Sequence, residues 1–179
     1  DAVYKYDALG IRVGTFSLAS GNGASSGVAV VGSDVYVLDS SGKKVYKYDS
    51  SGTLRATSKT LRVVTGTNNL NSPTGLAIDG GELWVVDDGN NKIYRYSLAD
   101  AFASSGYLNA LQNITLAAGY QNAGGLAIDT YYLYVVDYSA KQFYRYPRIG
   151  GAGTASMVMK EFGGTNLDTP SGATMDGTT

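Results

Sequence analysis

The sequence predicts an all-β protein built from repeated four-stranded units, on three observations. Tyrosine accounts for 15 of the 179 residues and glycine for 24, and aromatic residues favour strands whereas glycine favours tight turns. Charged residues make up 16%, against about 25% in an average globular domain, which excludes disorder driven by charge. A pattern of apolar, Tyr, basic and Tyr residues recurs along the chain. A chain of this length is expected to form one domain with its own core.

The spacing of the motifs defines the repeat. The Tyr-basic-Tyr pattern occurs at residues 3–6, 45–48, 93–96 and 143–146. In the last three copies a glycine comes first, an aspartate follows 12 residues later, and two tyrosines follow at 19 and 21 residues. The glycines are Gly27, Gly75, Gly125 and, in a fourth partial copy, Gly172; the first tyrosines are Tyr46, Tyr94 and Tyr144. Successive glycines are 48, 50 and 47 residues apart, so the period is about 48 residues.

Each element of the unit follows from its local pattern. The glycine segment predicts a first strand, the apolar run ending in aspartate a second, and Tyr-basic-Tyr a third. Looser fourth strands are expected at 54–61, 114–118 and 157–162. Turns are expected at 40–42, 88–91 and 139–140, and the first two contain Gly or Asn, which tolerate positive φ. Residues 99–111 could form either a short helix or an excursion between outer strands.

Four antiparallel strands at this period are typical of β-propeller blades. The sequence therefore predicts one propeller domain over 1–179, with complete blades at 27–62, 75–118 and 125–162. Residues 1–20 are expected to be the outer strands of a preceding blade, and 172–179 the innermost strand of the next. Joining the two ends leaves the ring eight residues short. Three explanations stay open: a segment of a larger propeller, an incompletely determined sequence, or a chain completed by a partner.

One unit resembles a known repeat. Residues 72–79 (SPTGLAID), 83–87 (LWVVD) and 89–94 (GNNKIY) are similar to the NHL repeat. The departures are Tyr-basic-Tyr in place of the usual Gln-Val-Phe, and Asn91 in place of the usual histidine. The resemblance implies a β-propeller of NHL or related lactonase-like type, usually with six blades.

The residue inventory limits the available chemistry. The chain has no cysteine and no histidine, which excludes disulfides, thiolate sites and imidazole ligands. No cofactor is expected, and Ca²⁺ is the metal that oxygen ligands would favour. A ring of Asp39, Asp87 and Asp137 could hold Ca²⁺, or each could cap the turn that follows it. The same two interpretations apply to the aspartates that end the first strands, Asp79, Asp129 and Asp176.

The Tyr-basic-Tyr strands also have two interpretations. Alternation places the tyrosines on one face and the basic residues on the other; the basic residues are Lys5, Lys47, Arg95 and Arg145. These faces could bind glycans or single-stranded nucleic acid. Alternatively, the tyrosines pack between blades and the basic groups pair with the repeat aspartates. A net charge of −1 makes a nucleic-acid partner unexpected, and no apolar run is long enough for a membrane span.

The loops before each glycine vary most between units, at 19–26, 66–74, 117–124 and 163–171. In a propeller such loops converge on one rim of the channel, where ligands commonly bind. Their polar side chains suit a neutral ligand such as a sugar or peptide, although plain turn chemistry would use the same residues. The candidate ligand-binding residues are Asn68, Asn69, Asn71, Tyr120, Gln121, Asn122, Thr165, Asn166 and Asp168.

These patterns favour a non-catalytic secreted or cell-surface scaffold that binds a protein or glycan. One alternative is a metal-dependent enzyme like the lactonase or lyase propellers, but the only glutamates are Glu82 and Glu161, and neither is well placed at a channel centre. Another alternative is a structural subunit of an oligomer or filament, completed by strand exchange. The expected partners are then the remaining blades or neighbouring copies of the chain.

Overall fold

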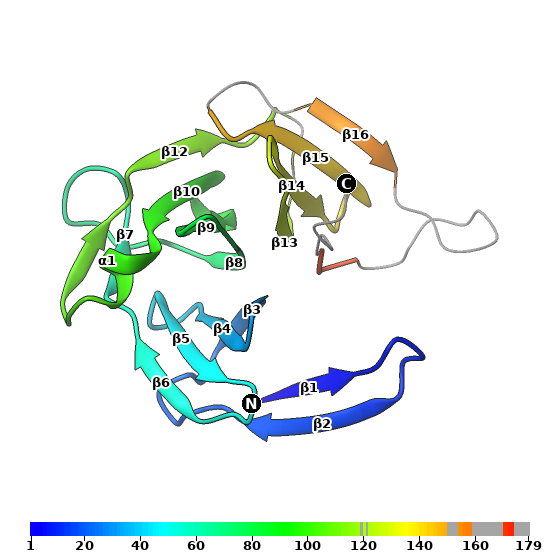
Figure 1. Cartoon of the computed structure of the whole chain (residues 1–179). Coiled ribbons are helices and arrows are strands. Elements are labelled where there is room, and N and C mark those ends of the chain that lie inside the picture. The colour runs from blue at the N-terminus through cyan, green and yellow to red at the C-terminus, as the bar shows by residue number, and fades with distance from the viewer. Residues whose placement is uncertain (119, 121, 150–153, 159–169, 174–179) are drawn as a thin grey trace.

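A computed structural model describes residues 1–118, 120, 122–149, 154–158 and 170–173. Strands carry nearly all of its regular structure (Figure 1). The described helical segments are the five-residue helix α1 (Leu98–Phe102) and the single 3₁₀ turn η1 (Asp88–Asn90). The predicted all-β class is confirmed.

Three four-stranded antiparallel sheets form the blades, arranged side by side with β3, β8 and β13 facing a common centre (Figure 1). The first blade has β3 (Ser25–Val31), β4 (Asp34–Asp39), β5 (Lys44–Asp49) and β6 (Leu54–Thr57). The second has β8 (Pro73–Asp79), β9 (Glu82–Asp87), β10 (Lys92–Ser97) and β12 (Gln112–Thr115). The third has β13 (Ala123–Ile128), β14 (Tyr132–Asp137), β15 (Gln142–Pro147) and β16 (Thr154–Val158). The predicted architecture of four-stranded antiparallel blades is confirmed.

Partial structure flanks these blades at both ends. At the N-terminal end, β1 (Ala2–Tyr6) and β2 (Arg12–Ser17) form a two-stranded antiparallel sheet. The Asp7 carboxylate closes the turn between them by accepting hydrogen bonds from the backbone of Leu9 and Ile11, both at 2.9 Å. At the other end, residues 170–173 lie against Gly124 and Gly125 of β13.

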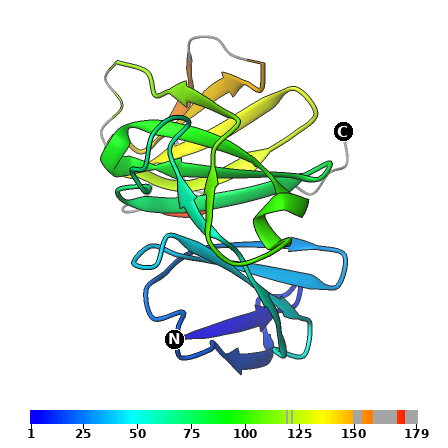
Figure 2. The same cartoon turned by 90° about the vertical axis from the view of Figure 1, so that its left-hand side faces the viewer.

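The segment 98–111 combines both of the structures that its sequence left open. Ser97 caps α1 by accepting a hydrogen bond from the backbone of Asp100. After the helix, β11 (Tyr107–Asn109) pairs in parallel with β7 (Thr60–Arg62), outside the four-stranded blades. Figure 2 shows α1 between the first and second blades. The predicted fourth strand at 54–61 is therefore divided, because β7 leaves its own blade to pair with this excursion.

Close packing of neighbouring blades explains the repeat glycines. A Cβ added to Gly27 would lie 3.1 Å from the Gly75 Cα, and one added to Gly75 would lie 2.9 Å from the Gly124 carbonyl oxygen. At Gly125 it would lie 2.6 Å from the Ala173 nitrogen. None of the three repeat glycines has positive φ. The requirement is therefore steric, since adjacent innermost strands approach backbone to backbone.

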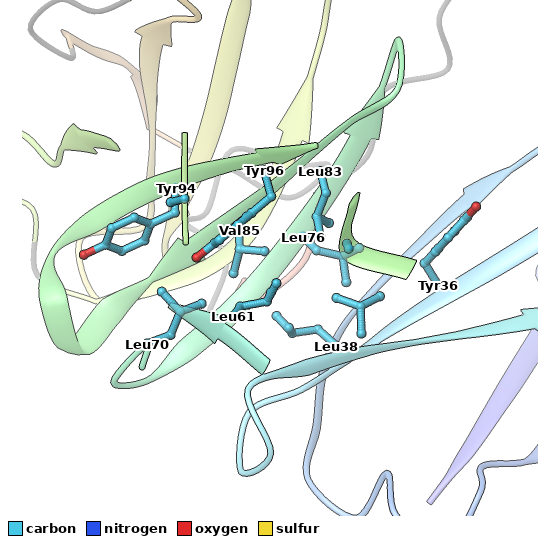
Figure 3. Close-up of a cluster of buried hydrophobic side chains, with 12 residues drawn as sticks. Tyr36, Leu38, Leu61, Leu70, Leu76, Leu83, Val85, Tyr94 and Tyr96 are labelled. Carbon is cyan, nitrogen blue, oxygen red and sulfur yellow. The ribbon is translucent and has the colours of Figure 1, made fainter. Parts of the chain in front are cut away.

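The hydrophobic core lies between blades. Figure 3 shows Leu76 and Val85 of the second blade facing Leu38 of the first blade and Leu61 of β7. A second cluster joins the second and third blades in the same way, around Trp84 and other buried side chains. Each blade is thus stabilised by burying its faces against its neighbours, as burial of apolar area requires.

The repeat tyrosines pack in these interfaces. The six tyrosines of the Tyr-basic-Tyr strands β5, β10 and β15 are 8% exposed or less. The second tyrosine of each blade also forms a hydrogen bond with the main chain of the segment that leads into its blade. These bonds join Ala19 N to Tyr48 Oη (3.0 Å), Tyr96 Oη to Arg62 O (2.9 Å) and Ala117 N to Tyr146 Oη (3.0 Å).

The basic residues of the third strands do not pair with the repeat aspartates, so that part of the packing interpretation is wrong. Lys47 pairs with Asp34 at 2.7 Å, and Arg95 pairs with Glu82 at 2.6 Å. Both acids begin a second strand, which lies beside the basic residue in the antiparallel register. Arg145 instead lies over the ring of Tyr132, at the equivalent position of the third blade.

The turn residues with positive φ match the expectation only at Asn91. They are Lys43, Asn91 and Lys141, with φ of 55°, 51° and 56°, so two of the three are lysines. Gly42 and Gly89 do not have positive φ. In every complete blade the residue with positive φ lies directly before the third strand. The predicted glycines lie earlier in the turn.

Candidate functional site

One rim carries both the loops before the repeat glycines and the turns between second and third strands, because β8 begins beside the end of β9 (Pro73 pairs with Asp87). On this rim a groove of about 290 Å³ opens between the loop that follows β7 and the outer strands of the second blade. Its lining is mostly polar. The lining residues are Val63, Val64, Thr65, Asn68, Asn69, Asn90, Lys92, Tyr94 and Asn113.

One wall of the groove is the loop that leaves the first blade. This loop closes on itself, since the Val63 amide donates to the Asn68 carbonyl at 3.1 Å. Arg62 and Asn69 form a β-bridge, and the Arg62 Nε lies 3.4 Å from the Asn69 Oδ1. These bonds hold Asn68 and Asn69 at the mouth of the groove.

The other wall is formed by the outer strands of the second blade. The left-handed residue Asn91 ends the turn, and the alternation of β10 then directs Lys92 and Tyr94 to the same face. Asn113 of β12 lies directly opposite Tyr94 in the antiparallel register. The groove is therefore composite, with one wall from the loop between β7 and β8 and the other from the second blade.

The groove can donate and accept hydrogen bonds. Among the described residues Lys92 makes no ion pair, so its ammonium group is available to a ligand. Tyr94 also lines the groove, although its side chain is 2% exposed, and burial raises the pKa of its hydroxyl. Amide side chains both donate and accept. This arrangement suits a ligand rich in oxygen atoms.

The structure separates the predicted ligand-binding residues. Asn68 and Asn69 line the groove, whereas three others bond within the protein. Asn71 donates to the Gly89 carbonyl at 3.1 Å, and Asn122 donates to the Ser139 hydroxyl at 2.8 Å. The Tyr120 hydroxyl lies 3.4 Å from the Asp88 carboxylate. Gln121, Thr165, Asn166 and Asp168 lie outside the described residues.

The sequence reasoning missed seven of the nine groove residues: Val63, Val64, Thr65, Asn90, Lys92, Tyr94 and Asn113. Tyr94 and Asn90 were interpreted only as parts of the repeat and its turn. Asn113 had a signal of its own, because Asn113-Ile114-Thr115 is a glycosylation sequon. Lys92 had no such signal in the sequence, since only the tertiary structure places it opposite the loop that follows β7.

The three repeat aspartates are fully buried and accept main-chain hydrogen bonds. Asp39 and Asp137 cap their following turns, at Ser41–Gly42 and Ser139–Ala140. Asp87 instead binds the amides of Asn71 and Ser72, at 2.8 and 2.7 Å. Across the described ranges no three His, Cys, Asp or Glu side chains are grouped to hold a metal.

The opposite rim carries an ion-pair network around Glu82. The Glu82 carboxylate accepts from Arg95 at 2.6 Å, Arg148 at 2.9 Å and the Trp84 indole at 3.1 Å. Arg148 also pairs with Asp79 at 2.6 Å, so the network joins the second and third blades. The remaining acidic residues singled out from the sequence are Asp129, Glu161 and Asp176. Asp129 binds the amides of Tyr131 and Tyr132, whereas Glu161 and Asp176 lie outside the described part of the chain.

This network predicts a pH-dependent contribution to stability. Burial alone would raise the pKa of Glu82, but the hydrogen bonds from Arg148 and Arg95 outweigh it and lower the pKa. A lowered carboxyl pKa contributes stability above the unfolded value of about 4.3, and that contribution is lost as the pH falls through the folded value. Glu82→Gln should therefore lower the free energy of unfolding by roughly 1 kcal/mol at pH 7, and this difference should shrink as the pH falls below about 4.3.

Urea titrations at pH 7 and pH 3 measure this difference. Asp100→Asn, at an exposed helical position, serves as the control and should change stability little at either pH. An equal loss for Glu82→Gln at both pH values would contradict an ionic contribution.

Comparison with known proteins identifies the fold. No protein-family model and no curated protein matches the chain. Among solved structures, it is similar to glutaminyl cyclase from Myxococcus xanthus, with 16% identity and a TM-score of 0.57 over 80% of this chain and 55% of that one. It is also similar to virginiamycin B lyase from Staphylococcus aureus, with 13% identity and a TM-score of 0.54 over 86% of this chain and 47% of that one.

A structure described as streptogramin B lyase gives a similar result, with 13% identity and a TM-score of 0.55 over 89% of this chain and 47% of that one. These neighbours are β-propellers. The chain has a β-propeller fold. It spans about half the length of the solved structures that it resembles. Within the described residues, no helix of this propeller has the length and apolar character needed to cross a membrane.

Proposed function

We propose that this β-propeller is a non-catalytic binding module that holds a polar protein or glycan ligand in the rim groove. The composition of the groove is the observation that supports this proposal. Four of its nine lining residues are asparagines, and Lys92 and Tyr94 add an ammonium group and a hydroxyl. A small number of oriented polar groups on a rigid scaffold is the usual basis of ligand specificity.

A catalytic function is the second candidate, favoured by the enzyme names of the solved structures with this fold. The groove argues against catalysis at this site, because its described lining contains no carboxylate. Without histidine or cysteine in the chain, a metal at this site would need such a carboxylate, and Lys92 and Tyr94 are the side chains of the lining that could transfer a proton. We therefore favour binding over a metal-dependent lactonase or lyase activity.

The proposal includes the NHL type of propeller and a secreted or cell-surface location. The pattern at 72–79 and 83–94 supports the type, and the low charged fraction of 16% supports the location. Counting the blades in a crystal structure of the native particle tests the NHL type, for which six blades are expected. Fractionation of the source cells tests the secreted or cell-surface location, and recovery of the protein only from cytosol would contradict it.

A screen against a printed glycan array and a peptide library tests the binding function, followed by calorimetry on the hits. Lys92→Ala is expected to weaken binding at least about tenfold, because a hydrogen bond from a charged donor contributes roughly 1.5–3 kcal/mol. Thermal unfolding should stay unchanged, since Lys92 makes no ion pair within the described residues.

The chain offers a matched control for this variant. Lys44 occupies the equivalent position of the first blade, opposite Asp39 as Lys92 is opposite Asp87, and it does not line the groove. Lys44→Ala should therefore bind like the unmodified protein. Equal affinities for the two variants would show that the ligand binds elsewhere, and a screen without hits would contradict the proposed classes of ligand.

A further inference from the structure

The strand β1 has an open edge. Its Tyr-Lys-Tyr sequence makes it the equivalent of the third strands β5, β10 and β15, each of which pairs on both edges, with a second and a fourth strand. In the described residues β1 pairs only with β2, the equivalent of a fourth strand. The edge that would pair with a second strand is unoccupied there, and free backbone donors and acceptors on such an edge can bind an added strand.

The face of the first blade beside β1 is only partly covered. Its outer half is buried, because Val37 and Tyr48 pack against Val3 and Phe16 of β1 and β2. Its inner half is open, and Val28 of β3 is 56% exposed. The equivalent residues of the next two blades, Leu76 and Leu126, are both 3% exposed. In those blades the inner strands of the preceding blade cover them.

Lys5 of β1 lacks the partners of its equivalents. Lys47 and Arg95 each pair with an acid that begins the neighbouring second strand, and each lies over an aromatic ring of that strand. Lys5 makes no ion pair with a described residue. The missing partner is therefore a second strand with an aromatic residue in this register and, as in two of the three blades, an acid that pairs with the basic residue. In the third blade Arg145 lies over Tyr132, which begins β14.

We propose that the edge of β1 and the surface around Val28 bind a two-stranded β-hairpin with the pattern of the first two strands of this repeat. The outer strand of the hairpin pairs antiparallel with β1 and places an acid and an aromatic residue near Lys5, as Glu82 and Trp84 lie near Arg95. Its inner strand runs beside β3 and covers Val28. This interaction surface is independent of the rim groove.

A second copy of the chain cannot supply this hairpin from its described strands. Each described second strand, β4, β9 and β14, already pairs on both edges inside its own blade. Donating one would require opening a blade whose second strand is almost entirely buried. The proposed occupant is therefore a hairpin of this pattern that is not one of the described strands. An oligomer formed by strand exchange is the less favoured arrangement.

An N-terminal extension tests the proposal. Lys92 is the equivalent of Ala2, so a second copy of residues 73–90 joined to Asp1 places β8- and β9-like strands in the required register. Hydrogen–deuterium exchange of residues 2–6 and 25–31 is expected to slow about tenfold or more in the extended chain, because pairing and burial protect edge amides. A control extension has serines at the copied positions of Trp84 and Val86, and should give no protection.

Val28→Ser provides a second, independent readout. It is expected to leave the unfolding midpoint of the unextended chain unchanged and to lower that of the extended chain, because only the latter buries Val28. Unchanged exchange of β1 in the extended chain, or equal protection by the control extension, would overturn the proposal. So would sedimentation of the unextended chain as a dimer with β1 already protected, because a second copy would then be the occupant. Lys92→Ala should leave all of these results unchanged.

Discussion

Gly75→Val is expected to destabilise the propeller by roughly 3 kcal/mol or more, or to prevent folding. The Cβ of any side chain at this position would lie 2.9 Å from both the Gly124 carbonyl oxygen and the Leu126 nitrogen. These atoms belong to the backbone of the neighbouring innermost strand, which cannot move aside as a flexible side chain would. The free energy of unfolding from urea titrations measures the effect.

Gly23→Val is the matched control. A Cβ at Gly23 meets no atom within 4 Å, and Gly23 does not have positive φ, so the same substitution should change stability by less than about 1 kcal/mol. If the two variants lose the same stability, the effect would come from the loss of glycine itself, and the close approach between blades would not explain the repeat glycine. A soluble Gly75→Val variant with the stability of the unmodified protein would also contradict the steric explanation.

Asp87→Ala is expected to cost roughly 3–5 kcal/mol. The Asp87 side chain is fully buried and accepts three hydrogen bonds of 2.7–2.8 Å, from the amides of Asn71 and Ser72 and from the side chain of Asn90. Removing the carboxylate leaves these donors without their acceptor, and unpaired buried donors are costly. Urea unfolding measures the loss, with the exposed Asp100→Ala as the control.

Calcium separates the two interpretations of Asp87. If its carboxylate serves only to anchor the loop, millimolar Ca²⁺ should not raise the unfolding temperature of the protein above its value in EDTA. A ligand that binds only the folded state must raise that temperature. Stabilisation by Ca²⁺ that disappears in Asp87→Ala would therefore contradict the purely structural role and revive the metal site.

Asp87 also illustrates how far the repeat predicts local structure. Capping of the following turn was one expected role for all three repeat aspartates, and Asp39 and Asp137 have it. Asp87 instead binds the backbone of residues 71–72, while η1 occupies its turn. A spacing that is identical in three copies predicts where a carboxylate lies, but the adjacent loop determines which amides it accepts from.

The sequence by itself determined the strands and their order. Alternating apolar and tyrosine residues at fixed spacing specify four antiparallel strands in each unit, because the period of two and the turn residues act locally. The steric need for Gly27, Gly75 and Gly125 was visible as their regular recurrence, although its cause was not. These features depend on residues close together along the chain.

Only the tertiary structure decided what lies between blades. The groove combines Asn68 and Asn69 with Lys92 and Tyr94 of the next blade, and the parallel pairing of β11 with β7 joins segments about 47 residues apart. Neither leaves a periodic signal, because each arises where two units meet at an angle and distance set by packing of the whole core. The surface around Val28 was hidden for the same reason, since exposure depends on which strands cover a residue and not on the residue itself.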